Sequence, residues 1–418
     1  MSKQERNFRI LWANSFCLLD TSSGASISVR EILHQLSKNN FDIEILGATI
    51  FDSANGAKLF KKLLTASENN KQSLLTIRDG NLTHKLIKTN FSNIDNMTTS
   101  ETMSLYNLGC KTLDSFKPDL LFFYGGLPVE RLICREARIR KIPSAAYLVN
   151  PNFLGTSWCR DVDLIITDTR ATSNYYKKRA GFTPVPVGKF IGARIKVKNQ
   201  TREYLTFVNP SWSKGAGIFA ALALILDKKR PDIKLEVIQS RGNWTEISEH
   251  ISRLFTANFK SSFSNVKVTD HTSNMQKIYR RSRVIFSPSL RWESGSRVLA
   301  EATLNGIPVM ATKVGGNQEI LDSSGLYFSV PPKCLKKPYY ALPSIKWFDS
   351  LIKVIEELWD NEKFYNEHVN RSYETGKRYS DINESVNKII KAFYPFLSER
   401  KGDLDFSKLI FQNHKQIN

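Results

Sequence analysis

Short apolar runs alternate with amphipathic stretches along the first half of this 418-residue chain. The expected strands are 8–12, 41–46, 119–124, 144–149 and 164–167, and the expected helices are 27–37, 128–140 and 171–180. This alternation predicts a parallel, doubly wound sheet, which binds ligands at the carboxyl ends of its strands. The polar stretch 51–110 is rich in Asn, Thr and Ser, and we expect long loops there with one or two helices.

Near residue 190 the pattern breaks at a Pro- and Gly-containing stretch followed by polar residues, which is typical of an interdomain linker. A second series follows, with expected strands at 204–208, 234–238, 266–268, 284–287 and 308–311, and expected helices at 214–227, 274–281, 297–305, 347–371 and 382–398. We therefore expect an α/β fold with two doubly wound, Rossmann-like domains. The expected boundaries are 1–192, 193–380 and a helical segment 381–418 that packs back towards the first domain.

The chain carries 60 Lys and Arg against 40 Asp and Glu, a net charge of +20. Such an excess suggests an anionic partner: nucleic acid, an anionic membrane face or phosphorylated small molecules. The charge is spread along the chain without a block of like charges, and no nucleic-acid-binding motif is visible, so nucleic acid is the disfavoured alternative. Arg131, Arg135 and Arg138 share one face of an expected helix. We prefer a solvated face there over an anionic-lipid patch.

The five cysteines are scattered and never spaced as Cys-x-x-Cys, which argues against a disulfide framework or a zinc site and fits a reducing cytoplasm. Neither a signal peptide nor an apolar run of membrane-spanning length is visible in the sequence. We therefore expect a cytoplasmic protein, and any contact with the inner face of a membrane would be peripheral.

The segment from 288 to 320 has the strongest chemical pattern. A loop carrying Glu293 continues through the small residues Ser294, Gly295 and Ser296 into a helix that begins near Arg297. The first N–H groups of a helix bind anions, and small residues let a phosphate approach the backbone. Carboxylates beside such a site suit ligand hydroxyl groups, because a carboxylate repels a phosphate.

This segment resembles the retaining, nucleotide-sugar-dependent glycosyltransferases of family 4, which have the GT-B fold. Three motif elements carry the resemblance in order: the pair Glu293 and Glu301, Asn-Gly-Ile-Pro-Val at 305–309, and Gly-Gly-Asn-Gln-Glu at 315–319. Upstream, Lys214-Gly215 resembles the family's donor-diphosphate loop. The match in motifs covers about 204–330, and the first domain is matched in architecture alone.

The resemblance implies a metal-independent hexosyltransferase with two domains facing across a cleft and no cofactor, since the nucleotide-sugar is a co-substrate. It implies that Glu301 binds the ribose, Glu293 contacts the donor sugar, and Lys214 with the backbone N–H groups of Arg297 and Val298 neutralises the diphosphate. The other implied donor-side residues are Ser294, Gly295, Ser296, Asn209 and His271. The acceptor is implied to be a glycan or a lipid-linked sugar in polysaccharide synthesis.

The sequence departs from the family pattern in the loop after Glu293 and on the acceptor side. The family often has a His near residue 149, where this chain has Asn150, and a basic residue before the Lys-Gly pair, where this chain has Asn209 and Pro210. The loop with Ser23 and Gly24 sits where the family has a glycine loop. We assign Ser23, Gly24 and Asn150 to the acceptor side. These departures keep two alternatives open beside the transferase: a basic nucleic-acid-binding protein and a catalytically silent scaffold on the same fold.

Overall fold

The computed structural model describes residues 7–65, 73–255 and 263–401. The chain divides into two compact units: Met1–Phe190 with Ile382–Asn418, and Ile191–Asp381. The boundaries expected from the sequence lie two residues later at the first crossing and one residue earlier at the second. The helical segment that begins at Ile382 belongs to the first unit. Its residues 402–418 lie outside the described part.

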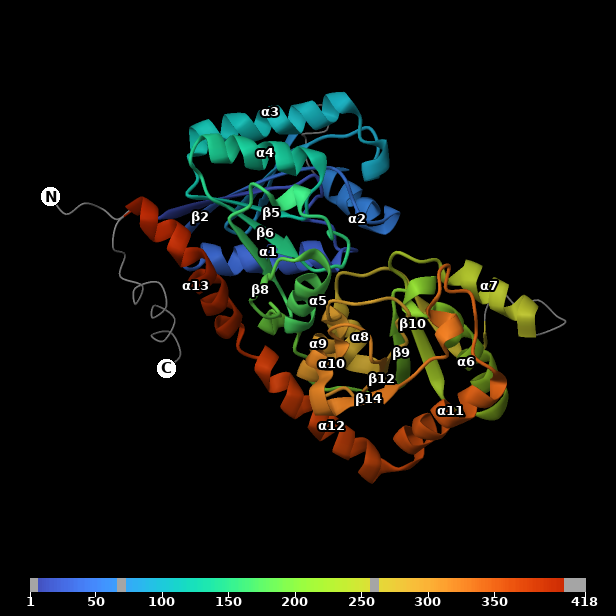
Figure 1. Ribbon diagram of the computed structural model, residues 1–418. Coiled ribbons are helices and arrows are strands. Elements are labelled where there is room, and N and C mark those ends of the chain that lie inside the picture. The colour runs from blue at the N-terminus through green and yellow to red at the C-terminus, as the bar shows by residue number, and fades with distance from the viewer. Residues whose placement is uncertain (1–6, 66–72, 256–262, 402–418) are drawn as a thin grey trace. The chain divides into compact units, whose positions relative to one another are not determined.

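The first unit contains an eight-stranded sheet with the order β3-β4-β2-β1-β5-β6-β7-β8 (Figure 1). In chain order its elements are β1 (Phe8–Ala13), α1 (Gly24–Ser37), β2 (Phe41–Ala48), α2 (Ala54–Thr65), β3 (Leu74–Asp79), β4 (Leu82–Ile87), α3 (Thr99–Phe116), β5 (Leu120–Tyr124), α4 (Pro128–Ile139), β6 (Ser144–Leu148), β7 (Leu164–Thr167), α5 (Arg170–Ala180), β8 (Val185–Pro186) and α13 (Ile382–Lys401). Neighbouring strands are parallel except β3 and β4.

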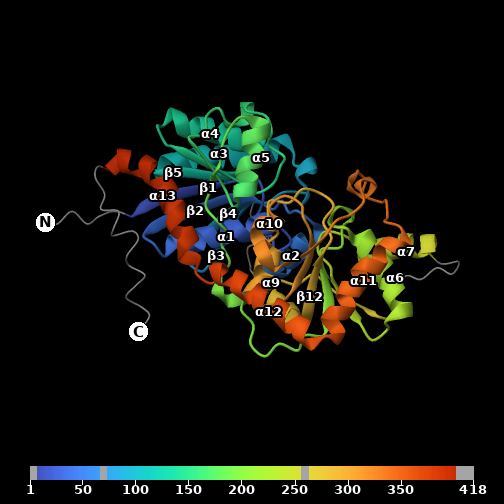
Figure 2. The same cartoon turned by 60° about the horizontal axis from the view of Figure 1, so that its bottom comes forward.

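Alternate residues of the central strands point to opposite faces of this sheet, as the pleat requires. Ile10 and Trp12 of β1 share a core with α1 and with the apolar side of α13, whereas Leu11 shares a second core with α3, α4 and α5. Figure 2 shows α3 and α4 on one side of the sheet and α1 and α13 on the other. The apolar residues of α13 are therefore part of the first unit's core.

The second unit contains a six-stranded parallel sheet with the order β11-β10-β9-β12-β13-β14. In chain order its elements are β9 (Tyr204–Val208), α6 (Ala216–Lys229), β10 (Lys234–Ile238), α7 (Trp244–Phe255), β11 (Val266–Thr269), α8 (Met275–Arg281), β12 (Ser282–Ser287), α9 (Arg297–Leu304), β13 (Val309–Thr312), α10 (Asn317–Leu321), β14 (Gly325–Phe328), α11 (Ile345–Asp360) and α12 (Glu362–Gly376). Helices α6, α7 and α11 cover one face, and α8, α9 and α10 cover the other. The α/β, doubly wound fold class is confirmed.

The loop prediction for 51–110 is wrong in one respect: an antiparallel hairpin, β3–β4, lies inside it. Leu82, His84 and Leu86 of β4 are buried in alternation, which is the normal strand pattern. A buried histidine occupies one of these inward positions, beside Asp79 at 3.5 Å, so the apolar alternation is interrupted in the sequence.

The single helix expected at 347–371 is two helices, α11 and α12, which meet at Asn361. The side chain of Asn361 accepts a hydrogen bond from the backbone N–H of Phe364 and thereby caps α12. Apolar residues keep a helical spacing on both sides of this break, so periodicity alone does not reveal it. Helix α7 and strand β14 were also missed. None of the described helices is long and apolar enough to cross a lipid bilayer.

Candidate functional site

The sequence-predicted donor-side residues, apart from His271, lie near the switch point of the second sheet. Strands β9 and β12 are neighbours, but the chain leaves β9 towards β10 and leaves β12 towards β13 on the other side. The loops after β9 and β12 therefore diverge, which is where doubly wound sheets bind ligands. Lys214 lies after β9, and Glu293 lies in the loop after β12.

Backbone contacts hold these loops together. The N–H of Leu290 donates to the carbonyl of Ser213 (2.9 Å), and the N–H of Gly316 donates to the carbonyl of Glu293 (2.8 Å). Gly315 has a φ of 54°, and a Cβ on it would lie 1.8 Å from the Glu293 carbonyl oxygen. The Gly-Gly turn thus lets the loop after β13 pack against the backbone of Glu293, a contact that a side chain would block.

The carboxylate of Glu293 is paired with two cations. Its Oε1 lies 2.8 Å from Lys214 Nζ and 3.3 Å from Arg291 Nε, and the residue is 8% exposed. Burial acts to raise the pKa of Glu293, but Lys214 and Arg291 outweigh it and hold that pKa below the usual value. Burial lowers the pKa of Lys214. The two cations therefore favour the carboxylate form of Glu293 at the switch point.

Glu301 lies one turn into α9 with both carboxylate oxygens bound. Arg297 Nε is 2.6 Å from Oε1, and the hydroxyl of Tyr279 donates to Oε2 at 2.7 Å. Tyr279 is fully buried, and burial together with the charge of Glu301 raises the pKa of Tyr279 well above its usual value. Tyr279 therefore stays a neutral hydrogen-bond donor and fixes the orientation of the Glu301 carboxylate.

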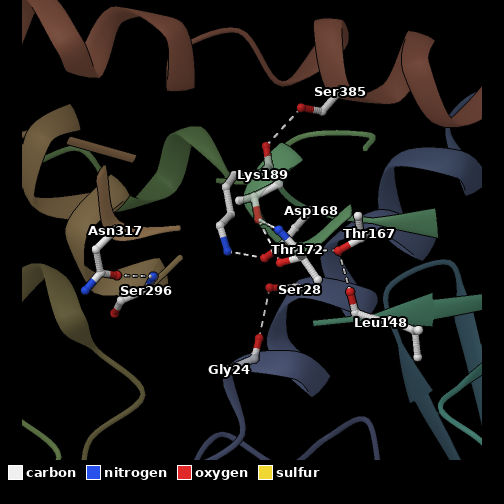
Figure 3. Close-up of polar contacts among 11 residues, drawn as sticks. Gly24, Ser28, Leu148, Thr167, Asp168, Thr172, Lys189, Ser296, Asn317 and Ser385 are labelled. Atoms are coloured by element: carbon white, nitrogen blue, oxygen red, sulfur yellow. Dashed lines mark hydrogen bonds and ion pairs between the residues drawn. The ribbon is translucent and has the colours of Figure 1, made fainter. Parts of the chain in front are cut away.

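The start of α9 is held by α10. The backbone N–H of Ser296 donates to Asn317 Oδ1 at 3.3 Å, as Figure 3 shows, and Asn317 is fully buried. Gly295 has a φ of 123°, a conformation that favours glycine. Ser294 is buried beside it, and Arg297 and Val298 are the first two residues of α9, as expected.

Asn209 lies at the carboxyl end of β9, whereas His271 lies beyond the carboxyl end of β11. Asn209 directly follows β9 with a φ of 67°, and its Oδ1 accepts the backbone N–H of Arg241 at 3.3 Å. His271 lies two residues beyond β11, which β10 and β9 separate from β12. The donor-side role of His271 stays a prediction.

The first sheet has its own switch point, between β1 and β5. Glu130 of α4 is buried there, and its Oε1 accepts hydrogen bonds from Ser15 N (2.6 Å), Ser15 Oγ (2.8 Å) and Asn14 Nδ2 (3.1 Å). Its buried Oε2 has no hydrogen-bond partner within the described part of the chain. Burial raises the pKa of Glu130. The amide of Asn150 donates to the hydroxyl of Tyr124 at the end of β5.

Ser23 caps α1, its hydroxyl accepting the backbone N–H of Ser26, and a Cβ on Gly24 would meet no atom within 4 Å. No other backbone packs closely against Gly24, unlike at Gly315, so this position does not require glycine.

Lys189 and Asp168 form a buried ion pair beyond β7, and the hydroxyl of Ser385 in α13 donates to the Lys189 carbonyl (Figure 3).

Four residues with contacts at these edges were not predicted from the sequence: Tyr279, Arg291, Asn317 and Glu130. Arg291 and Asn317 lie within the motif segment, so their positions were the available signal. Tyr279 and Glu130 lie on expected helices, and nothing in the local pattern distinguishes them from ordinary helix residues. Their contacts arise between elements that are distant in the sequence.

Comparison with known proteins supports the motif. Residues 202–337 match the family model described as glycosyl transferases group 1. No curated protein matches the chain in sequence.

Solved structures match nearly the whole chain in fold. Sucrose-phosphate synthase from Thermosynechococcus elongatus matches with a TM-score of 0.66 at 12% identity, covering 94% of this chain and 100% of that one. Anabaena Alr3699/HepE, solved in complex with UDP and glucose, matches with a TM-score of 0.64 at 14% identity, covering 93% and 99%. Trehalose-6-phosphate synthase OtsA matches with a TM-score of 0.62 at 13% identity, covering 93% and 99%.

At these identities the solved structures establish the fold, which is GT-B with two Rossmann-like domains. The family model covers the part of the chain that contains Lys214, Glu293 and Glu301. Residues 202–337 of the chain therefore form a group 1 glycosyltransferase domain within a GT-B fold.

Proposed function

We propose that the second unit binds a nucleotide-sugar donor at its switch point and that the enzyme transfers the sugar with retention of configuration. HepE was solved with UDP and glucose, and the trehalose-6-phosphate enzyme of E. coli was solved with UDP-2-fluoro glucose. These proteins share the fold of this chain, and their ligands support a donor of the same class here.

The observation that carries the proposal is the charge pairing of both motif carboxylates. Glu293 is held by Lys214, and Glu301 is held by Arg297 and Tyr279. A Lys–Glu pair keeps the buried site compensated before a donor arrives, since an unpaired buried charge is costly. On donor binding we expect Lys214 to contact the diphosphate, Glu293 to accept hydrogen bonds from sugar hydroxyls, and Glu301 to bind the ribose.

In the transfer, the bond between the anomeric carbon and the phosphate oxygen breaks, and the diphosphate leaves with the electron pair. The acceptor hydroxyl oxygen bonds to the same face of the anomeric carbon, and its proton passes to the departing phosphate oxygen. Lys214 and the N-terminus of α9 stabilise the charge that develops on the diphosphate. This role requires no side-chain base.

The test is nucleotide release with UDP-, GDP-, dTDP- and ADP-sugars, after a thermal-shift screen for the donor that stabilises the protein. We expect Lys214→Ala to lower kcat about 100-fold or more, the scale for removing one group that stabilises a developing anion. Glu301→Ala should raise the donor KM. Lys353→Ala, on the exposed side of α11, is the matched control and should change neither parameter. Wild-type rates for both site variants would refute the proposed site.

We further propose that the acceptor is a glycan or a lipid-linked sugar, used at the inner face of a membrane. The support is the net charge of +20, which is larger than a diphosphate site needs. Assays that compare water-soluble and lipid-linked acceptors test this, with faster transfer expected to the lipid-linked form.

A further inference from the structure

Helix α4 in the first unit presents an exposed stripe of basic and apolar residues. The stripe consists of Arg131, Leu132, Arg135, Arg138 and Ile139. The opposite side of the helix, which includes Val129, Ile133 and Ala137, packs in the core that α4 shares with α3. Figure 1 shows α4 beside α3. Because the opposite side of α4 is packed in the core, the helix cannot rotate and the stripe stays on the surface.

The carboxylates near the stripe are already bound. Glu136 is 2.6 Å from Arg140 and accepts a hydrogen bond from the hydroxyl of Tyr106 at 3.0 Å. Arg140 also lies 2.7 Å from Asp114. Within the described residues, Arg131 and Arg135 form no ion pair. Arg138 pairs with Asp161 at 3.1 Å, but its side chain is 62% exposed, where such a pair contributes little. Two of the three arginines in the stripe thus carry a charge that no ion pair within the described residues compensates.

Two large apolar side chains lie in the same stripe: Ile139 is 68% exposed and Leu132 is 46% exposed. They are seven residues apart, two turns of a helix, so they share a side, and Arg135 lies between them along the axis. Isolated apolar residues on a surface are common. Here they adjoin three arginines, which is the composition of a helix lying in a membrane interface.

We propose that the exposed stripe of α4 docks the enzyme on a bilayer that contains anionic phospholipids. Leu132 and Ile139 enter the boundary between headgroups and acyl chains, while the guanidinium groups bind lipid phosphates. A nucleic-acid partner would use the arginines but would leave the two aliphatic side chains without a role. The inference rests on the proposed function only for the location of the acceptor, and it is independent of the donor chemistry.

The test is co-sedimentation of the full chain with two kinds of vesicle, one of phosphatidylcholine alone and one that also contains about 30% phosphatidylglycerol. The anionic lipid gives the second vesicle a negative surface potential that attracts basic residues. We expect binding to the anionic vesicles, weakened by high salt, and little binding to the neutral ones. The double variant Arg131→Glu/Arg135→Glu should lower the partition coefficient at least about 25-fold, roughly fivefold per lost charge contact. Leu132→Ser/Ile139→Ser should lower binding without changing the charge.

The matched control is Lys346→Glu/Lys353→Glu, which makes the same charge change on exposed positions of α11. If the control loses as much binding as the α4 variant, net charge and not the stripe explains the binding, and the proposal is wrong. Equal binding of the wild type to both vesicle types, or preferential binding of duplex DNA through the same arginines, would also overturn it. The α4 variants should keep the donor-induced thermal shift, so failure here is separable from failure of the proposed donor site.

Discussion

The switch points of the two sheets use buried glutamates in opposite ways. In the second unit, Glu293 is ionised and paired with Lys214 and Arg291. In the first unit, Glu130 accepts neutral donors from Asn14 and Ser15 and has no cation against it among its hydrogen-bond partners. The pKa of Glu293 is lowered, whereas burial raises that of Glu130. The switch point of the second sheet therefore suits an ionic ligand. At the switch point of the first sheet, the buried carboxylate of Glu130 is instead hydrogen-bonded to neutral donors of the protein itself.

The largest difference in stability between the two switch-point regions should come from substituting a glycine in each, Gly315 in the second unit and Gly24 in the first. Gly315→Ala places a Cβ against the Glu293 carbonyl in a left-handed conformation, and we expect a loss of about 3 kcal/mol. In thermal denaturation this corresponds to roughly 6–12 °C for a domain of this size. Donor binding should be lost with it.

The control for Gly315→Ala is Gly24→Ala in the loop of the first unit, where a Cβ meets open space. This change should be neutral or stabilising by about 0.5 kcal/mol, because it restricts the unfolded chain. Equal destabilisation by both substitutions would contradict the distinction between the two loops.

Glu130 provides the next test. Glu130→Ala leaves the buried donors of Ser15 and Asn14 without their acceptor, and we expect a loss of about 2–3 kcal/mol. Glu130→Gln keeps an acceptor oxygen and should cost less. Chemical denaturation monitored by intrinsic fluorescence measures both losses.

The pH dependence of Glu130 has a definite sign. Because burial raises the folded pKa of Glu130 above its usual value of about 4.5, its contribution to stability is present below that value and is lost as the pH rises through the folded pKa. Glu130→Gln should therefore gain stability relative to wild type as the pH rises from about 4.5. A stability difference that does not change with pH would contradict a raised pKa.

The smallest effect should come from Glu293→Gln, with the opposite pH dependence. The lowered pKa means that the ion pair stabilises the protein above pH 4.5 and that this contribution disappears as the pH falls through the folded pKa. We expect Glu293→Gln to cost about 1–2 kcal/mol at pH 7, since Lys214 keeps some contact with solvent. Melting temperatures from pH 7 to about 3.5 should show the gap to wild type closing.

A surface pair serves as the control for Glu293→Gln. Glu384 and Lys388 of α13 form an exposed i,i+4 pair, and Glu384→Gln should change the melting temperature very little. If the two substitutions have the same effect, Glu293 is no more than a surface carboxylate.

Elements with strong periodicity or continuous apolar runs were predictable from the sequence. Strand β7 and helix α4 lie where the pattern placed them, to within one residue. The prediction failed where a polar residue occupies a buried position, as His84 does in β4, and where one helical period continues across a cap, as at Asn361. Periodicity reports which side of an element is apolar, but it does not report which polar groups find partners inside the fold.

The sequence by itself determined the α/β class, the break near residue 190 and the motif that holds Lys214, Glu293 and Glu301. These are local properties, because period, turn composition and motif spacing are contained in contiguous residues. The tertiary structure decided the partners of those residues: Tyr279 on Glu301, Asn317 on Ser296, and Gly315 against Glu293. It also placed α13 in the core of the first unit. These contacts join segments that are remote in sequence, so only the folded chain brings their atoms within bonding distance.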